Sequence, residues 1–148
     1  EELNERIRRA RNVIVYGVKE SDSVDAIQNT AQDKITISRI LSTINPDKTW
    51  LPNCVFRIGE KTKDKSRPIR LVFDSAEIAN DFLVECSKCV NRDNWLQGIF
   101  FCHDRSPRER NYLKWLRKIL KQRIDCGEKD LTIKYISGVP KIITIQKM

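Results

Sequence analysis

The sequence predicts an α+β fold: a mixed domain of strands and helices, followed by a basic helix and a β-hairpin. Three observations support this fold. Four short segments are rich in β-branched and aromatic residues, and two segments between them repeat apolar residues with helical spacing. A long amphipathic segment then precedes two alternating ones. Apolar residues make up 40% of the 148 positions and charged residues 32%, as is typical of a globular protein.

Residues 1–10 are predicted to be the end of a coiled-coil helix. Leu3, Ile7 and Ala10 recur at spacings of four and three residues, as in a coiled-coil seam. A frayed terminal helix is the alternative, because so short a segment does not form a stable helix alone.

The segment 11–18 is predicted to be the first strand. Side chains alternate across a strand, so Val13 and Val15 should share one face, and Ile14 and Tyr16 the other. The polar residues that follow, 19–32, have no clear period and are expected to be mostly loop.

A helix is predicted to begin at Asp33, because apolar residues then recur at i, i+3, i+4 and i+7. The Asn45–Pro46 pair is expected to end it, since the residue before a proline disfavours helical geometry. The second and third strands are predicted at 54–58 and 68–74, joined by a charged loop.

A second helix should follow the third strand. Asp74 is the expected N-cap, with Glu77 completing a capping box. Its buried face is expected to hold Ile78, Phe82, Leu83 and Cys86. The segment 98–104 is the predicted fourth strand, so the order within 11–104 is β-α-β-β-α-β. That order defines the RNA-recognition-like, or ferredoxin-like, sandwich.

Residues 105–148 are predicted to form a small basic C-terminal domain. Ser106 should cap a helix, with Pro107 at its first position and Glu109 closing a capping box, and Gly127 should end it. The helix should carry an apolar arc of Tyr112, Leu113, Leu116, Ile119 and Leu120. The opposite arc is cationic: Arg110, Lys114, Arg117, Lys118 and Lys121. Residues 131–145 alternate as a hairpin around Ser137–Gly138.

The net charge of +8 is unevenly distributed along the chain. Residues 1–104 hold 16 basic and 16 acidic residues, whereas 105–148 hold 12 basic and only 4 acidic residues. Within the balanced part, 57–70 holds six basic residues against two acids. Such clusters favour a polyanionic partner, and a basic surface that serves only solubility is the alternative.

These clusters and the sheet supply the candidate RNA-binding residues. They are Tyr16, Arg57, Lys61, Lys63, Lys65, Arg67, Arg70, Arg105, Arg108, Arg110, Lys114, Arg117 and Lys121. The usual aromatic pair on the third strand is absent, because Pro68 and Arg70 occupy its positions. Ile14 replaces the usual ring of the first strand, and Tyr16 lies on the same face. Arg70 can stack on a base or contact a phosphate, or else form an ion pair across the sheet.

Four stretches together resemble the first-open-reading-frame proteins of non-LTR, LINE-type retrotransposons. They are RNVIVYGVKES, FRIGEKTKDKSRPIRLVF, DRSPRERNYLKWL and LTIKYISGVPKI, and they lie between Arg11 and Ile145. Host genes derived from such elements are similar in the same way. By position, the RNA-contacting basic residues of this family correspond to Arg57, Arg67 and Arg70, and then to Arg105 and Arg108.

The resemblance implies a protein that coats its own RNA, acts as a nucleic-acid chaperone and forms a ribonucleoprotein. It implies self-association through an upstream coiled coil and a cytoplasmic location, with the nucleus as a second site. The expected partner is single-stranded RNA bound with little base preference, and single-stranded DNA is a further candidate. The alternative function is a protein-interaction module on an RNA-recognition fold, in a domesticated host protein.

No enzyme, cofactor or metal is expected. His103 is the only histidine and has no nucleophile pattern beside it, and no glycine-rich phosphate loop is present. Cys86 and Cys89, with Cys102 downstream, are better explained as buried thiols than as zinc ligands. Trp50, Trp95 and Trp115 are expected at the edge of the core rather than as base-stacking rings.

The five cysteines are irregularly spaced, which indicates reduced thiols in the cytosol or nucleus. No apolar run is long enough to span a bilayer, so no membrane partner is expected.

Overall fold

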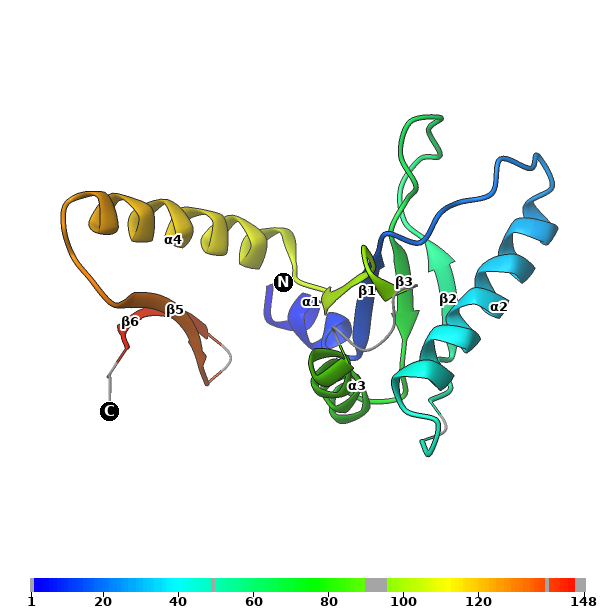
Figure 1. Cartoon of the computed structure of the whole chain (residues 1–148), viewed down its shortest axis with the longest axis horizontal. Coiled ribbons are helices and arrows are strands. Elements are labelled where there is room, and N and C mark those ends of the chain that lie inside the picture. Colours follow the sequence, from blue (N-terminus) through cyan, green and yellow to red (C-terminus); the bar gives the residue numbers. More distant parts are fainter. Residues whose placement is uncertain (1, 49, 90–95, 138, 146–148) are drawn as a thin grey trace. The chain divides into compact units, whose positions relative to one another are not determined.

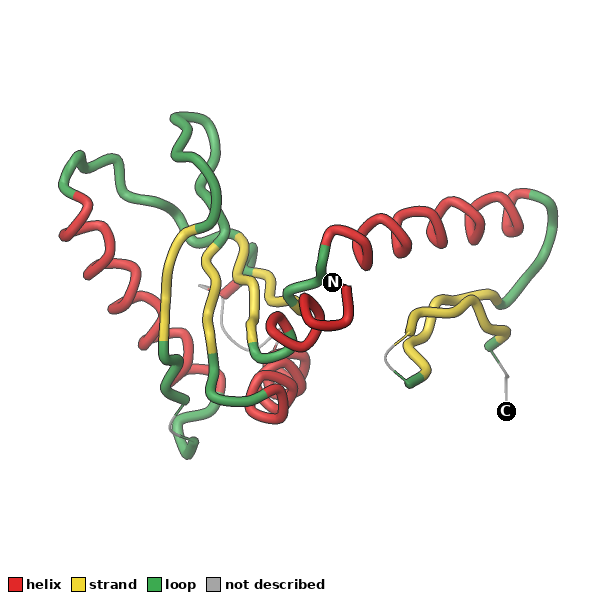
Figure 2. The backbone as a smooth tube through the Cα atoms, turned by 180° about the vertical axis from the view of Figure 1, so that it is seen from behind, coloured by secondary structure: helices red, strands yellow, loops and turns green. Residues whose placement is uncertain are grey.

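A computed structural model describes residues 2–48, 50–89, 96–137 and 139–145 (Figures 1 and 2). The chain divides into two compact units, with the boundary between Asp104 and Arg105, except that Glu2 groups with the second unit. The described residues form four helices and six strands, so the predicted α+β class is confirmed. The first unit contains α1 (Glu2–Arg9), β1 (Asn12–Tyr16), α2 (Ala26–Ile44), β2 (Cys54–Arg57), β3 (Ile69–Val72), α3 (Ala76–Cys89) and β4 (Phe100–His103). The second contains α4 (Pro107–Asp125), β5 (Leu131–Ile136) and β6 (Val139–Thr144).

The sheet of the first unit has the strand order β2-β3-β1-β4, and each neighbouring pair is antiparallel. β3 and β1 are therefore central, and β2 and β4 are the edges. The hydrogen-bonding direction alternates along β3. Phe73 donates its N–H to the carbonyl of Arg11, ahead of β1, while Ile58, after β2, donates to the carbonyl of Pro68. This alternation fixes which backbone groups of β2 point at β3 and which point away.

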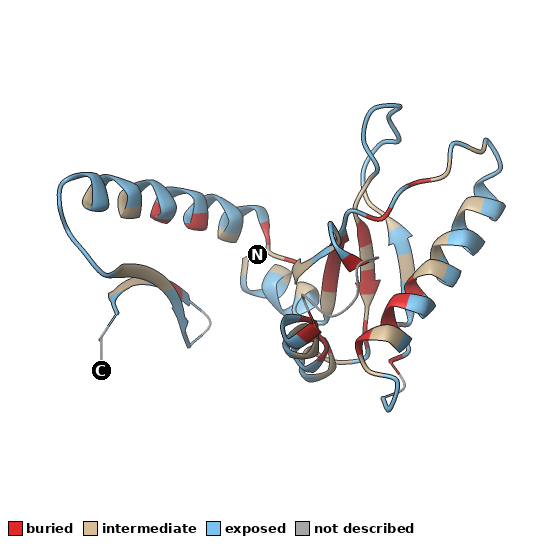
Figure 3. Cartoon of the chain, in the orientation of Figure 1, coloured by how far each residue is buried: buried red, intermediate tan, exposed pale blue. Residues whose placement is uncertain are grey.

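One face of the sheet forms the core with α2 and α3. Val13, Val15, Ile69 and Leu71 lie on that face with at most 1% of their surface exposed (Figure 3). The helices add Ile37, Ile40, Leu41, Ile44, Ala79, Phe82, Cys86 and Cys89. All four residues expected on the buried face of α3 are confirmed there: Phe82 and Cys86 belong to the core, and Ile78 and Leu83 pack against it half-buried. The apolar periods in the sequence therefore identified the correct faces.

Helix α2 begins earlier than the sequence analysis expected. The prediction that 19–32 is mostly loop is wrong from Ala26 onward. Asp25 is the N-cap, and its carboxylate accepts hydrogen bonds from the backbone N–H of Ile27 at 3.0 Å and of Gln28 at 3.3 Å. The first turns are polar because they cover no core residue, which removes the apolar period there. The predicted end at Asn45 is confirmed.

The N-cap predicted for α3 is also wrong by one residue. The hydroxyl of Ser75 accepts the N–H of Ile78 at 3.3 Å, as an N-cap side chain does. Asp74 instead accepts a hydrogen bond from the amide of Asn53 at 2.7 Å, which links the segments that flank β2 and α3.

The second unit is a helix and a two-stranded hairpin. The capping box of Ser106 and Glu109 is present, and Gly127 follows the helix with a φ of +104°, as predicted. Leu113 and Leu116 are buried, and Ile119 and Leu120 are half-buried. Tyr112 is exposed, so it does not belong to the buried arc to which it was assigned.

Gly17 and Gly98 bring the ends of β1 and β4 into close approach. Gly17 has a φ of +91°, and a Cβ at this position would lie 1.9 Å from the carbonyl oxygen of Gly98. Only glycine satisfies both conditions, so this pair fixes how β1 leaves the sheet. Among the described residues, no helix is long and apolar enough to cross a membrane.

Candidate nucleic-acid interface

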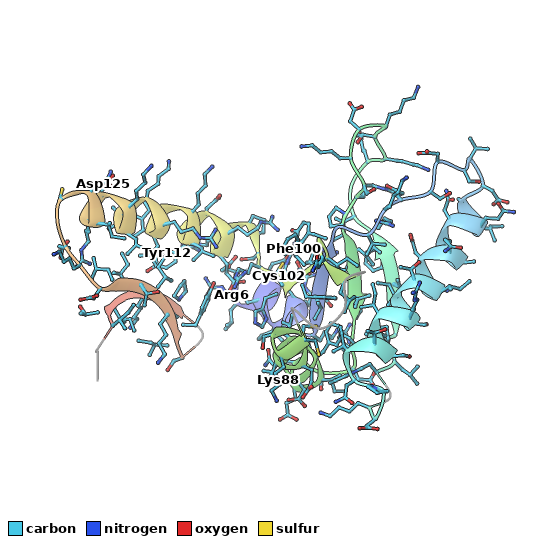
Figure 4. All side chains as sticks on the ribbon, viewed as in Figure 1. Arg6, Lys88, Phe100, Cys102, Tyr112 and Asp125 are labelled. Atoms are coloured by element: carbon cyan, nitrogen blue, oxygen red, sulfur yellow. The ribbon has the colours of Figure 1, made fainter. Side chains whose placement is uncertain are left out.

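The sheet face opposite the core carries three exposed aromatic rings. Directly opposed residues of antiparallel strands lie on the same face, and Arg70 opposes both Ile14 and Phe56, while Tyr16 opposes Phe100. Tyr16 is 46% exposed, Phe56 44% and Phe100 66%. We call the set of Tyr16, Phe56, Arg70 and Phe100 the open face. Phe100 is labelled in Figure 4.

Phe56 and Phe100 were missed by the sequence analysis. A comparison with the usual ring positions directs attention to the first and third strands, where this chain has Ile14 and Arg70. The relevant signal was the alternation in the two edge strands. Phe56 follows the half-buried Val55, which packs on the core, so its own side chain must point the other way. The rings are therefore distributed over β1, β2 and β4 rather than β1 and β3.

Arg70 lies at the centre of the open face and is held from two sides. Its Cζ is 5.6 Å from the centroid of the Phe56 ring, within cation–π range. Its Nε is 3.1 Å from Oδ2 of Asp104, an ion-pair distance, although the N–H is not directed at the oxygen for a hydrogen bond. The side chain is 24% exposed, so part of the guanidinium is accessible. Arg70 therefore forms the ion pair considered in the sequence analysis and still exposes part of its side chain to solvent.

Asp104 is a buried anchor for this arrangement. Its side chain is 2% exposed and accepts hydrogen bonds from Nη1 of Arg9 at 2.8 Å and from Nδ2 of Asn12 at 2.9 Å. The carboxylate of Glu5, which accepts a hydrogen bond from Arg9, and then Asp104 raise the pKa of Arg9 above its ordinary value, against the opposing effect of burial. Asp104 therefore neutralises part of the charge of Arg70 and restrains where that side chain lies.

Arg57 does not fit the RNA-contacting role predicted for it. Its side chain is 5% exposed. Nε and Nη2 donate to the carboxylate of Asp33 at 3.0 and 2.8 Å, and the remaining N–H groups reach the carbonyls of Val18, Lys19 and Arg67. All five N–H donors of the guanidinium are thereby used within the protein. Arg57 joins β2 to α2 and to two loops.

Arg67 is also held within the protein, by Glu20. Its Nε and Nη2 donate to Oε2 of Glu20 at 3.0 and 2.5 Å, and Nη1 donates to the carbonyl of Gly59 at 3.0 Å. These hydrogen bonds hold the pKa of Glu20 below its ordinary value, against the opposing effect of burial, and the nearby charges of Arg67 and Arg57 act in the same direction. Arg67 keeps 25% of its side chain exposed.

The lysines of the loop between β2 and β3 remain on the surface. Lys61, Lys63 and Lys65 are exposed on a loop that extends beyond the ends of the strands (Figure 1). Nζ of Lys61 donates to the carbonyls of Ser21 and Ser23 at 2.9 and 3.3 Å. Once the internal ion pairs of the arginines are accounted for, the surplus charge of this loop is carried by the three lysines.

In the second unit, the predicted cationic arc is exposed. Arg110, Lys114, Arg117, Lys118 and Lys121 are all exposed, as is Arg108. Figure 4 shows long side chains with nitrogen tips on the side of α4 away from the hairpin. Arg105 is half-buried, with its Cζ 5.2 Å from the centroid of the Tyr135 ring.

The tryptophans differ in their surroundings. Trp50 is 8% exposed and makes an edge contact with Phe82, 5.5 Å between centroids, which confirms the prediction for it. Trp115 is 54% exposed and lies 5.9 Å from Tyr112, so its assignment to the core edge is wrong. These two rings form an exposed aromatic pair on α4. Trp95 lies outside the described residues.

The thiols give no sign of a metal centre in the part of the chain that the structure describes. Cys86 and Cys89 are buried, Cys102 is half-buried, and Cys54 and Cys126 are exposed. Burial raises the pKa of Cys86 to about 12, which keeps this thiol protonated and unreactive. Among the described residues, no three His, Cys, Asp or Glu side chains lie together where they could hold a metal ion.

Comparison with known proteins provides no family assignment. No protein-family model matches the chain, and no curated protein matches it. The resemblance to retrotransposon proteins therefore stays a prediction, and the geometry of the chain's own residues carries the functional argument.

Proposed function

We propose that this protein binds single-stranded RNA with little base preference. The observation that carries the proposal is the set of three exposed rings on the open face, which share that face with a restrained arginine beside Phe56. Unpaired bases stack on aromatic side chains and on guanidinium planes, and every base offers a face for stacking. Stacking on rings does not read the hydrogen-bonding edges of the bases, so we expect binding that tolerates many sequences.

We assign the first unit to the RNA-recognition-like, ferredoxin-like arrangement as part of the same proposal. The strand order β2-β3-β1-β4, with α2 and α3 contributing to a core on one face, supports this assignment. In such an arrangement the sheet face opposite the core is left for a ligand. That is the face with Tyr16, Phe56 and Phe100.

The cations supply the affinity for phosphate. The lysines of the loop between β2 and β3 and the arc on α4 are exposed and are available to contact a polyanion. With the resemblance in sequence, this supports a nucleic-acid chaperone within a retrotransposon-type ribonucleoprotein rather than an enzyme. Single-stranded DNA is a second ligand of the same chemistry. Leu3 and Ile7 of α1 are 69% and 62% exposed, which suits the end of a coiled coil that mediates self-association.

The test is the affinity for a labelled oligouridine measured by fluorescence anisotropy over a range of salt concentrations. Each phosphate neutralised on a single strand contributes about −0.7 to the slope of log K against log salt. For about four to six contacts, we expect a slope roughly between −3 and −4. A slope near zero, or no binding at low salt, contradicts the proposal and favours a protein-interaction module.

A further inference from the structure

A groove follows the free edge of β2. Some candidate RNA contacts, among them Phe56, Lys61 and Lys63, line it together with residues of α2. Its larger part, about 900 Å³, lies between β2, the first turns of α2 and the loops on either side. A second part of about 510 Å³ continues toward Leu51 and Pro52. Thr30 and Val55 line both parts, so the two are adjacent along the strand.

The backbone of β2 presents hydrogen-bonding groups to this groove. β2 pairs only with β3 among the described strands. Ile58 donates its backbone N–H to the carbonyl of Pro68, just before β3. Because the direction of the backbone groups alternates from residue to residue along a strand, Cys54 and Phe56 also direct their N–H and C=O groups at β3. Val55 and Arg57 therefore direct theirs away from the sheet. Alternating outward donors and acceptors are what an added peptide strand satisfies.

Two polar groups on residues that line the groove have no hydrogen-bond partner among the described residues. They are Oδ1 of Asn29, on the α2 wall, and the indole Nε1 of Trp50, a residue that is 8% exposed. Both atoms are buried, so a peptide in the groove would reach them only after a movement of the surrounding side chains.

The charges of the groove favour an acidic occupant. The carboxylates of Glu20 and Asp33 are neutralised by Arg67 and Arg57. The other charged residues of the lining are Lys34, Lys61, Lys63 and Asp22, a surplus of two positive charges. Carboxylate side chains that alternate along an extended peptide complement these lysines.

We propose that this groove takes a short extended acidic peptide of a partner protein, which adds as a fifth strand to the free edge of β2. The backbone of Val55 and Arg57 supplies the ladder, and Lys34, Lys61 and Lys63 select carboxylates. A peptide is favoured over RNA at this place because the groove offers main-chain hydrogen bonds and no exposed ring other than that of Phe56 among its described lining residues. The groove is distinct from the centre of the open face, although Phe56, Lys61 and Lys63 line it and also belong to the proposed RNA surface.

The probe is a synthetic peptide of about eight residues, alternating valine and glutamate, with both ends blocked. We expect it to shift the amide signals of Val55 and Arg57 in the NMR spectrum of the 148-residue protein and to slow the exchange of those amides. A peptide of the same sequence with alternate amides N-methylated should not bind, because it cannot form the ladder. A valine–lysine peptide should bind at least about tenfold more weakly.

Lys63→Glu should weaken the valine–glutamate peptide at least about fivefold. Lys65→Glu is the matched control, because it makes the same charge change on the same loop outside the groove, and it should change the affinity by less than about twofold. Equal binding of the N-methylated peptide, or no shift at Val55 and Arg57 at about 1 mM probe, overturns the proposal. An oligouridine that shifts these two amides while the peptide does not assigns the groove to nucleic acid and also overturns it.

Discussion

The guanidinium of Arg70 lies over the ring of Phe56, with 5.6 Å between Cζ and the ring centroid. The pair joins an edge strand to a central strand and places a cation beside an exposed π-surface. A base that enters the open face meets a surface that is already ordered, because Asp104 restrains the same arginine. Pre-ordering of this kind lowers the entropic cost of binding.

Removing a ring from the open face should weaken RNA binding. Base stacking on an aromatic side chain contributes about 1–3 kcal/mol, so Phe56→Ala and Phe100→Ala should each lower oligouridine affinity roughly five- to 150-fold. Fluorescence anisotropy at fixed salt measures this. Val84→Ala is the control, because it removes an exposed apolar side chain of α3. Equal effects of all three changes would argue against stacking.

Removing charge from α4 should change the salt dependence. The double variant Arg117→Ala, Lys121→Ala deletes two exposed cations of the arc. If both contact phosphates, the slope of log K against log salt should become less steep by about 1.4, at about 0.7 per contact. Replacing Lys129 and Lys141, which are exposed in the same unit outside the arc, is the control. An unchanged slope in the double variant would show that the arc is only a solvated surface.

Arg57→Lys should destabilise the first unit without a specific effect on RNA. A lysine cannot reproduce five N–H donors in a planar fork, so the Asp33 pair and several carbonyls lose partners. We expect a loss of about 2–4 kcal/mol in the free energy of unfolding. Urea unfolding monitored by amide hydrogen exchange measures this loss. The control is Arg11→Lys at an exposed position, which should lower the free energy of unfolding by less than about 0.5 kcal/mol. A stable variant with weakened RNA binding would restore Arg57 as a contact.

The ion pair of Glu20 and Arg67 should make stability depend on acid pH. The pKa of Glu20 is lower in the folded protein than its ordinary value of 4.5. The contribution to stability is therefore complete above the unfolded-state pKa and is lost as pH falls through the lower folded-state pKa. Glu20→Gln should lose this part of the pH dependence below about pH 4.5, whereas Glu60→Gln, on the exposed loop, should retain it. Identical curves for wild type and Glu20→Gln would show that the pair contributes nothing.

Gly17→Ala should be much more damaging than Gly59→Ala. Both glycines have positive φ, +91° and +88°, so both substitutions strain the backbone by about 1–2 kcal/mol. Only at Gly17 does a Cβ meet another backbone, at the carbonyl of Gly98. We expect an additional loss of about 2 kcal/mol or more at Gly17, measured by urea unfolding. Equal losses would mean that the approach of Gly98 relaxes without cost.

Local patterns predicted the local structure well. The Ser106–Glu109 capping box and the stop at Gly127 depend on residues within a few positions of one another, so the sequence alone identifies them. The start of α2 was missed because an apolar period marks only the part of a helix that covers the core. Asp25 was nevertheless a recognisable N-cap.

The site was less accessible to prediction, because its partners are distant in sequence. Arg57, Arg67 and Arg70 appeared equivalent as a basic cluster, yet each forms an ion pair with a different acid: Asp33, Glu20 and Asp104. Charge counting cannot separate a cation used within the fold from one that is free for a ligand. The register of the sheet does so, and it also identifies Phe56 and Phe100.

The distribution of the five thiols has a practical consequence. Cys54 in the first unit and Cys126 in the second are exposed, whereas Cys86 and Cys89 are buried. Maleimide dyes react with accessible thiolates. The folded Cys102→Ser variant therefore offers one attachment point in each unit. A donor and an acceptor fluorophore at these two positions convert the separation of the units into an energy-transfer signal. RNA capture by one unit or by both then becomes distinguishable in single molecules.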